Sequence, residues 1–253
     1  MIQDFEPSDR PAAEIVAREI LAFAASGLLL PFGLGRGAAS TPRKAEQRTL
    51  VLIHGYLGNS GSFLPLSGYL KLLGIGPIRR FDYRSTDGIE RAAVALRDEL
   101  RANVRGGRID LVCHSMGGLV ARFYLQNLGG ARRVDRCITL ATPHQGTYSA
   151  YWVASRVGRE LRPDSALLAK LAATRDRAAR VRFSSIVAGS DNIVLPRIFA
   201  ADEDIVHVPN LGHVGLLFSP TVFRAISRRL LAPVAPGGSP SAFDAAFGQS
   251  CSG

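Results

Sequence analysis

The chain has 253 residues, of which 47% are hydrophobic and 21% are charged. These proportions exclude an intrinsically disordered protein, a coiled coil and a collagen-like fibre. The net charge is +10, but the basic residues are scattered along the chain and almost all of them are arginine. We therefore expect a basic surface with some attraction to anionic membrane, and no nucleic-acid partner.

The three cysteines, Cys113, Cys137 and Cys251, show neither a pairing pattern nor the spacing of metal ligands. Cys113 and Cys137 lie in apolar runs, where a thiol packs as a small hydrophobic group. The sequence therefore predicts no disulfide framework and no metal site. This cysteine usage fits a reducing compartment, so we expect a cytoplasmic protein that contacts the inner membrane face peripherally.

Residues 1–48 precede the first clear strand and form a separate N-terminal helical or apolar segment in this interpretation. The uncharged stretch from Ile20 to Gly35 is shorter than the about 20 residues that a transmembrane helix needs. An acidic opening, with Asp4 and Glu6, is unlike the basic start of a secretory signal. Two alternatives remain. One is an interfacial segment lying on a bilayer, and the other is a helix from about Pro11 to Ser26 that covers the following domain. In the first alternative, basic residues following the segment would meet anionic head groups: Arg36, Arg43, Lys44 and Arg48.

From Thr49 onward, apolar runs alternate with amphipathic stretches. We expect strands at about Thr49–His54, Pro77–Tyr83, Arg108–His114, Val134–Ala141, Val181–Ala188 and Asp204–Val208. Helices are expected at about Ser62–Leu73, Ile89–Val104, Gly118–Leu128 and Thr221–Leu231. Strands that are apolar at successive positions are typical of a sheet covered on both faces, and helical connections make such a sheet parallel. The pattern predicts one α/β domain over residues 49–232 with a mainly parallel sheet of about six strands.

Two intervals depart from this alternation. Residues 148–180 contain two short helical patterns joined at Arg162-Pro163 instead of one crossover helix, and we expect a small helical cap there. Residues 233–253 are rich in Pro, Gly, Ser and Ala and are expected to form a flexible tail.

Ser115 stands between a predicted strand and a predicted helix, in the stretch IDLVCHSMGGLV that begins at Ile109. A tight turn at this place lifts a serine hydroxyl out of the sheet edge and points the first N–H groups of the helix at a developing oxyanion. The pattern around it is C-H-S-M-G, in which Cys113 stands where G-x-S-x-G has its first glycine. Ser115 is therefore the candidate nucleophile, and an ordinary turn serine is the alternative.

A second Gly-rich turn, HGYLGNSG, follows the strand that ends near His54. An oxyanion hole needs two backbone donors, and we expect the N–H groups of Tyr56 and Met116 to supply them. His54 itself is expected to brace the loop.

A catalytic serine needs a general base, and the five histidines differ in position. His54 and His114 belong to the two turns already described, His144 follows the strand after the nucleophile, and His207 alternates with apolar residues in a strand. His213, on a glycine-flanked loop between the last strand and the last helix, is the best candidate.

The base in turn needs a carboxylate that holds its tautomer. Asp191 follows the strand that ends at Ala188, so serine, aspartate and histidine come in the chain order of the α/β-hydrolase triad. Asp202 and Asp204 are rivals because they lie nearer to His213 in the chain, and Asp164 is a weaker one.

The blocks VLIHGYLGN, VCHSMGGLVAR, LATPHQGT, GSDNIVLP and GHVGLLFSP, in this order, resemble the bacterial lipase and esterase branch of the α/β-hydrolase superfamily. The resemblance covers roughly Thr49 to Leu231. It implies a triad of Ser115, Asp191 and His213, with Tyr56 and Met116 as oxyanion donors. It also places the cap at 148–180, where apolar side chains favour an apolar acyl chain: Tyr148, Tyr151, Trp152, Val153, Leu167, Leu168 and Leu171.

We therefore expect a serine carboxylester hydrolase that acts through an acyl-serine on a small-molecule or lipid ester, with no cofactor. The alternatives are an amidase or thioesterase with the same triad, and a membrane-associated binding protein that keeps the fold without turnover. The sequence makes no prediction about the oligomeric state.

Overall fold

The computed structural model describes residues 3–4, 11–33, 48–104, 106–194 and 204–233. Within them, parallel strands form one sheet in the order β1-β7-β6-β5-β4-β2-β3. The strands are β1 (Gln3–Asp4), β2 (Thr49–Ile53), β3 (Ile78–Phe81), β4 (Ile109–His114), β5 (Val134–Leu140), β6 (Arg182–Ala188) and β7 (Ile205–Val208). The six strands expected from the sequence are confirmed. The two-residue β1, which pairs with β7, was not predicted.

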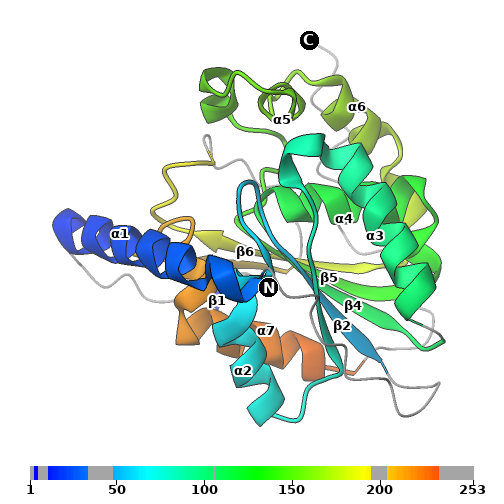
Figure 1. Cartoon of the computed structure of the whole chain (residues 1–253), viewed down its shortest axis with the longest axis horizontal. Coiled ribbons are helices and arrows are strands. Elements are labelled where there is room, and N and C mark those ends of the chain that lie inside the picture. The colour runs from blue at the N-terminus through cyan, green and yellow to red at the C-terminus, as the bar shows by residue number, and fades with distance from the viewer. Residues whose placement is uncertain (1–2, 5–10, 34–47, 105, 195–203, 234–253) are drawn as a thin grey trace.

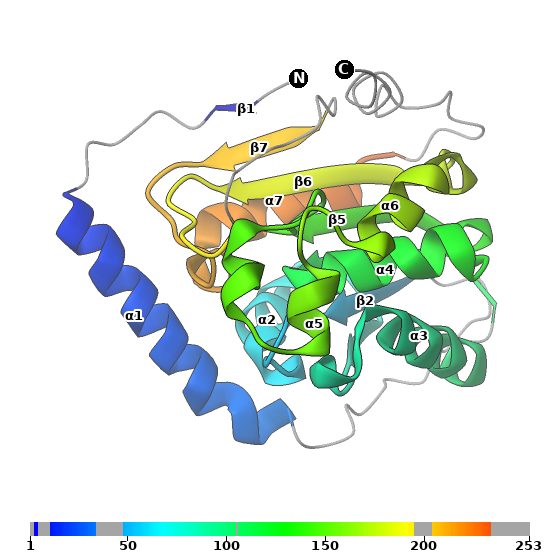
Figure 2. The same cartoon turned by 90° about the horizontal axis from the view of Figure 1, so that it is seen from above.

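Helices cover both faces of this sheet, as Figures 1 and 2 show. The helices of the described chain are α1 (Ala12–Leu29), α2 (Leu64–Leu72), α3 (Ile89–Asn103), α4 (Met116–Asn127), α5 (Arg156–Glu160), α6 (Ala166–Ala173) and α7 (Pro220–Leu231). In β2, Val51 and Ile53 join the core cluster under α3 and α4, whereas Leu50 and Leu52 join the cluster against α2 and α7. The unbroken apolar run of this strand therefore reflects burial on both faces.

The strand order locates the crevice in which a ligand can bind. The chain passes from β2 outward to β3 and then returns to place β4 on the other side of β2. In open α/β sheets, ligands bind beyond the carboxyl ends of the strands at such a reversal. Here the reversal lies between β2 and β4, with Ile53 opposite Cys113 at the carboxyl end of the pair. The loop after Ile53 and the turn after His114 therefore meet at one place.

Helix α1 lies beyond the carboxyl ends of the strands, toward which the strand arrows point in Figures 1 and 2. Together with the 3-10 turn η1 (Leu30–Gly33), it forms a helical segment, Ala12–Phe32, of 21 residues with a mean hydropathy of 1.7. By length and composition alone, this segment is long and apolar enough to cross a membrane. It is longer than the uncharged stretch from Ile20 to Gly35 because it also includes charged residues, so the expectation that this region does not span a membrane stays a prediction. Only 6% of it is buried. The expected helix is present, but most of its surface covers nothing.

Arg48 does not follow the apolar segment toward a membrane. Its guanidinium binds the carboxylates of Asp110 and Asp135, each at 2.8 to 2.9 Å, beside the amino ends of β4 and β5. This is the edge of the sheet opposite to α1. The expectation that Arg48 meets lipid head groups is therefore wrong, and Arg36, Arg43 and Lys44 lie outside the described residues.

Residues 148–180 form the 3-10 turn η5 (Tyr148–Trp152), α5, α6 and the 3-10 turn η6 (Arg175–Ala178). The side chains of Leu167, Leu168 and Leu171 are buried in the core cluster that α3 and α4 share. Their contact with an acyl chain stays a prediction, because the structure shows only that these side chains pack within the core. Tyr148, Tyr151 and Trp152 remain exposed.

Cys113 and Cys137 are free and buried, and burial raises the pKa of the Cys113 thiol well above its ordinary value. Both therefore behave as the small hydrophobic groups expected from their apolar runs. Cys251, Asp202 and the tail from residue 234 onward lie outside the described residues.

Candidate active site

Ser115 is the single residue between β4 and α4, and its backbone has φ 52° and ψ −127°. A non-glycine residue rarely adopts this positive φ, so the surrounding structure must hold it there. Gly117 shows how closely the strand and helix pass. A Cβ at this position would lie 2.5 Å from the carbonyl oxygen of His54. Cys113, in place of the usual glycine, is accommodated because its side chain is fully buried in the core.

The loop after β2 passes directly against this turn. A Cβ on Gly55 would lie 2.9 Å from the Cβ of Ser115, so only glycine allows this approach. In the part of the chain that the structure describes, the backbone N–H groups of Tyr56 and Met116 have no hydrogen-bond partner. Met116 is the first residue of α4, where the N–H is free by helix geometry and the helix dipole favours negative charge. The two expected donors thus stand unpaired on either side of Ser115.

The side chain and the carbonyl group of His54 make hydrogen bonds that hold this loop in place. Its Nδ1 donates to the carbonyl oxygen of Gly55 at 2.9 Å, while its own carbonyl accepts from the hydroxyl of Tyr83 at 2.7 Å. The two rings stack with centroids 4.3 Å apart. Burial lowers the pKa of His54, which keeps the ring neutral in this arrangement. These contacts fix the loop that carries Tyr56.

Asp191 and His213, 22 residues apart in the chain, are hydrogen-bonded: Nδ1 of His213 lies 2.8 Å from Oδ2 of Asp191. The other carboxylate oxygen of Asp191 accepts from the N–H groups of Ile193 and Val194 at 2.8 and 2.9 Å. Burial alone raises the pKa of the Asp191 carboxyl, but these hydrogen bonds outweigh burial, and the pKa lies below its ordinary value. A charged Asp191 accepts the Nδ1 proton and leaves Nε2 of His213 as the basic nitrogen.

His114 joins the serine turn to the histidine loop. Its Nε2 donates to the carbonyl oxygen of His213 at 3.1 Å, and the two rings lie 4.9 Å apart. Burial, followed by the proximity of His213, lowers the pKa of His114 to about 3. The structure thus places Ser115, which follows His114, beside the loop of His213. No hydrogen bond joins Ser115 to His213 among the described contacts, and such bonds are often long before substrate binds.

The rival residues have other partners. Asp204 accepts from Arg229 Nε at 2.8 Å and from Ser184 at the opposite edge of the sheet, so it is not the partner of His213. Asp164 accepts from the hydroxyl of Tyr151 at 2.9 Å. His144 contacts Thr139, with Nε2 at 3.1 Å from its hydroxyl oxygen. Asp202 lies outside the described residues, so the structure does not compare it with Asp191.

Glu19 of α1 helps to hold the loop of His213, a role that the sequence analysis missed. Its two carboxylate oxygens accept from the N–H groups of Val214 and Gly215 at 2.6 and 2.9 Å. These N–H groups follow His213 directly and begin the 3-10 turn η7 (Gly215–Phe218). Beyond its last residue, α1 is held where Asn59 donates to the carbonyl oxygen of Leu30 at 2.7 Å. Because Glu19 and Val214 are 195 positions apart in the chain, no local sequence signal indicates the contact between them.

Between these two attachments lies a pocket of about 270 Å³. It adjoins the proposed site through residues of the oxyanion loop, the serine turn, the histidine loop and α1. The lining residues are Phe23, Ser26, Gly27, Leu30, Gly55, Tyr56, Leu57, Gly58, Asn59, Ser62, His114, Val214 and Leu217. No residue of 148–180 is among them, whereas α1 contributes Phe23, Ser26 and Gly27. In the described part of the chain, no group of three or more His, Cys, Asp or Glu side chains is arranged to hold a metal ion.

Two protein-family models match the part of the chain that contains these residues. A model of the PGAP1-like alpha/beta domain matches residues 95–228, which include Ser115, Asp191 and His213. A domain of unknown function, DUF7379, matches residues 35–152, which include Tyr56 and Met116. The two matches overlap across the serine turn.

Curated relatives include the lysosomal thioesterase PPT2 of Rattus norvegicus, 30% identical over 134 residues, and that of Homo sapiens, 31% identical over 134 residues. Each alignment covers 48% of this chain and 42% of the relative, so the chain spans about two fifths of the relatives' length. Among solved structures, the mature Bacillus licheniformis lipase BlEst2 has a TM-score of 0.62 at 16% identity, over 77% of this chain and 96% of that one. Est1E from Butyrivibrio proteoclasticus has a TM-score of 0.54 at 15% identity, over 75% and 89%. The fold is that of the α/β hydrolases.

Proposed function

Because this chain belongs to the PGAP1-like alpha/beta domain family and has an α/β-hydrolase fold, we propose that it is a serine hydrolase that cleaves carboxylic esters with an apolar acyl group. The observation that carries the proposal is the hydrogen-bonded pair of Asp191 and His213 beside a strained Ser115 with two unpaired N–H groups. An acyl transfer to water needs these groups and no cofactor.

In the proposed reaction, the hydroxyl oxygen of Ser115 attacks the ester carbonyl while Nε2 of His213 takes its proton. Asp191 stabilises the imidazolium through Nδ1–H and stays ionised itself. The oxyanion of the tetrahedral intermediate is bound by the N–H groups of Tyr56 and Met116. Collapse expels the alcohol, which receives the proton from His213. Water then attacks the acyl-serine by the same steps and releases the acid.

The lining of the pocket supports the proposal of an apolar acyl group because much of it is apolar. Phe23, Leu30, Leu57 and Leu217 line it together with glycines. Its volume, about 270 Å³, lies just below the range of about 300 to 1,000 Å³ that is usual for small-molecule sites. We expect short and medium acyl chains to fit inside it and longer chains to project past α1.

A thioester substrate is the second candidate, favoured by the identity to the lysosomal thioesterases PPT2. An acyl-serine forms equally from an ester or a thioester, so the triad alone does not separate them. The leaving group is the part that differs.

The test is a panel of p-nitrophenyl esters of increasing acyl length, assayed beside the matching acyl thioesters and anilides, with Ser115→Ala as control. Ester cleavage that depends on Ser115 would support the first proposal. A kcat/KM for thioesters more than tenfold above that for the matching esters would favour the second. No Ser115-dependent cleavage of any member would leave a binding protein with this fold as the better account.

A further inference from the structure

The exposed apolar side chains of this protein are concentrated at one edge. Most of the large exposed hydrophobic residues in the described part of the chain lie either on α1 and η1 or in loops that follow β2, β5 and β6. They are Val16, Ile20, Leu21, Phe23, Leu28, Leu30, Phe32, Leu57, Tyr148, Tyr151, Trp152 and Ile193. All of these elements belong to the carboxyl edge of the sheet, where the proposed active site lies.

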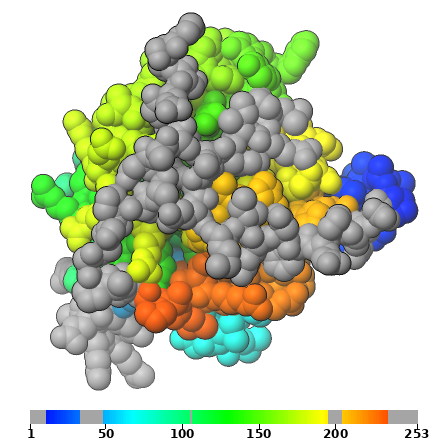
Figure 3. Space-filling model, turned by 180° about the vertical axis from the view of Figure 1, so that it is seen from behind, coloured from blue at the N-terminus to red at the C-terminus, as the bar shows by residue number. Residues whose placement is uncertain are grey.

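Helix α1 has two different sides. Glu19, Ala22 and Ser26 face the domain, and Ala22 is buried there. Ile20, Leu21 and Leu28 are not among the residues that line the pocket beside Ser115, and their exposures are 63%, 68% and 75%. No charged residue occurs from Ile20 to the end of the helix. Leaving this much apolar surface in water is unfavourable by about 25 cal/mol per Å². Figure 3 shows the start of α1, in dark blue, projecting from the side of the molecule.

Aromatic and basic side chains accompany this apolar surface. Trp152 is 91% exposed, and the rings of Tyr148 and Tyr151 stack with centroids 6.2 Å apart. The guanidinium of Arg162 lies over the ring of Tyr151 at 4.7 Å. Tryptophan, tyrosine and arginine together are typical of the head-group layer of a membrane, and basic residues favour anionic lipid.

We propose that this carboxyl edge, with α1 as its main element, docks on the surface of an anionic lipid bilayer, and that α1 lies in the interface. The net charge of +10 complements such a surface, and α1 carries no charged residue from Ile20 to its last residue, Leu29. A crossing orientation is disfavoured because Glu19, in the middle of the helix, and Leu30, which directly follows its last residue, are both bonded to the domain.

In this orientation α1 separates the bilayer from the acyl pocket. Its Phe23, Gly27 and Leu30 line the pocket, while Ile20, Leu21 and Leu28 face the lipid. An acyl chain then enters the pocket from the lipid beside α1 without crossing bulk water. This role in substrate delivery rests on the proposed ester hydrolysis, whereas the docking itself can be measured without turnover.

The experiment uses the full chain carrying Ser115→Ala, so that lipid is not consumed. Trp152 is the only tryptophan in the sequence and reports directly on this surface. On vesicles of equal parts phosphatidylcholine and phosphatidylglycerol, we expect its emission to shift to shorter wavelength and the protein to sediment with the vesicles. Both effects should weaken on phosphatidylcholine alone and in high salt.

A matched pair of variants tests the role of α1. Replacing Ile20, Leu21 and Leu28 with serine should weaken vesicle partitioning at least tenfold, because three side chains lose their transfer to lipid. Replacing Leu72 and Leu231, which are 89% and 64% exposed but lie on α2 and α7, should change it less than twofold. Circular dichroism and thermal unfolding without vesicles check that both variants fold.

Three results would overturn the proposal. One is the absence of any Trp152 shift or sedimentation on the anionic vesicles. Another is an equal loss of binding in both variants. The third is binding that survives an alkaline carbonate wash, which would mean that α1 crosses the bilayer. If vesicle binding is retained while no ester is cleaved by the wild type, the docking surface stands and the proposed function fails.

Discussion

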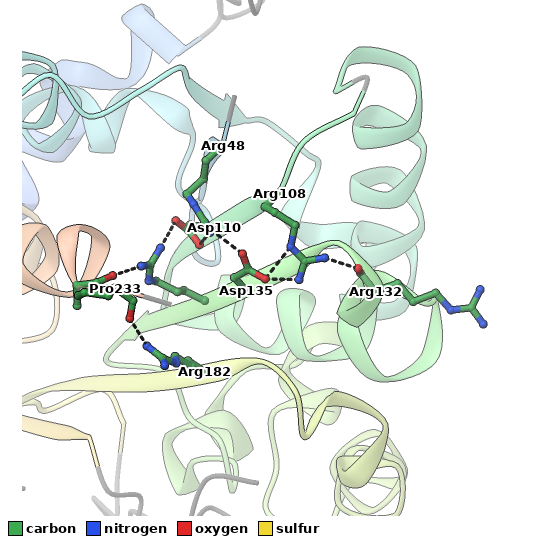
Figure 4. A network of polar contacts seen from close by, with 9 residues as sticks. Arg48, Arg108, Asp110, Arg132, Asp135, Arg182 and Pro233 are labelled. Carbon is green, nitrogen blue, oxygen red and sulfur yellow. Dashed lines mark hydrogen bonds and ion pairs between the residues drawn. The ribbon is translucent and has the colours of Figure 1, made fainter. Parts of the chain in front are cut away.

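At the amino ends of β4 and β5, the carboxylates of Asp110 and Asp135 are bound by arginines, as Figure 4 shows. We call this end of the sheet the amino edge. At the opposite, carboxyl edge, Ser115 follows β4 and stands beside two N–H groups without hydrogen-bond partners. Arg136 binds Asp110 at 2.9 Å, Arg108 binds Asp135, and Arg182 donates to the carbonyl oxygen of Pro233 at 2.7 Å. The carboxylates at the amino edge are thus paired within the protein, whereas the N–H groups of Tyr56 and Met116 at the carboxyl edge are available to a ligand.

The difference teaches where this protein uses its polar groups for stability and where for chemistry. A buried carboxylate held by arginines has little freedom to react, and removing one partner is strongly destabilising. An unpaired N–H or a strained backbone lowers stability and is retained where a reaction needs it. The following predictions test this division, from the largest expected effect to the smallest.

Ser115→Ala should lower ester turnover by about 10⁴ or more, because it removes the nucleophile while leaving the fold unchanged. The measurement is kcat/KM on the best ester of the panel, with circular dichroism as the folding check. Turnover within tenfold of wild type would mean that Ser115 is not the nucleophile and that the carboxyl edge is not used for this reaction.

Asp110→Ala should lower the free energy of unfolding by about 3–5 kcal/mol, because Arg136 would be left buried without its carboxylate. Ester turnover at low temperature should change less than twofold. Urea titration and a steady-state assay measure the two quantities. If instead ester turnover falls and the free energy of unfolding is unchanged, Asp110 does not serve stability, and the division between the two edges is wrong.

Tyr56→Phe should retain most activity, since Tyr56 is proposed to act through its backbone. Tyr56→Pro should lose about 10² to 10³ in kcat, because proline removes the N–H donor. A folded Tyr56→Pro protein with normal kcat would mean that the second oxyanion donor lies elsewhere.

The stability of the carboxyl edge should depend on pH through its buried histidines. His54 and His114 have lowered pKa values, that of His114 being about 3. Below pH 6.5 the unfolded chain therefore binds protons that the folded chain does not, so stability falls as the pH falls. Each such histidine contributes a slope of about 1.4 kcal/mol per pH unit.

In urea titrations from pH 6.5 to 4.5, His114→Gln should reduce the slope of the unfolding free energy against pH by about this amount. The lowered pKa of Asp191 acts in a lower window, below about pH 4. An unchanged slope in His114→Gln would show that His114 is charged in the folded protein.

Gly27→Leu should shift the acyl-chain preference. A Cβ on Gly27 meets no atom within 4 Å, and Gly27 lines the pocket, so a leucine there can enter the acyl space. We expect kcat/KM for medium acyl chains to fall about tenfold while acetate is nearly unaffected. Gly68→Leu is the matched control, because Gly68 is also helical and open but lies on α2. The same chain-length profile in both variants would exclude α1 as the wall of the acyl site.

Much of the fold could be predicted because the strands are apolar at successive positions and are separated by amphipathic helices. β1 was not predicted, since two residues carry no periodicity. The sequence could not show that the leucines of α6 are buried in the core, because a helix that packs on a core and a helix that covers a substrate show the same apolar spacing.

For the candidate site, the order of Ser115, Asp191 and His213 after successive strands was sufficient to propose the triad, and the structure joins Asp191 to His213. The contributions of α1 could not be predicted. The acyl wall and the contact of Glu19 depend on how a helix near the start of the chain packs against loops near its end.

The bond between Glu19 and Val214 also has a consequence for synthesis. Its partners are separated by 195 residues, so α1 leaves the ribosome long before the loop that receives it exists. At about 5–20 residues per second, roughly 10 to 40 s pass between the two events. During this interval α1 has its attachment to Asn59 but lacks the one made through Glu19. The loop that carries His213 is therefore the last part of the proposed triad to be synthesised, and the same loop completes the binding of α1 to the domain.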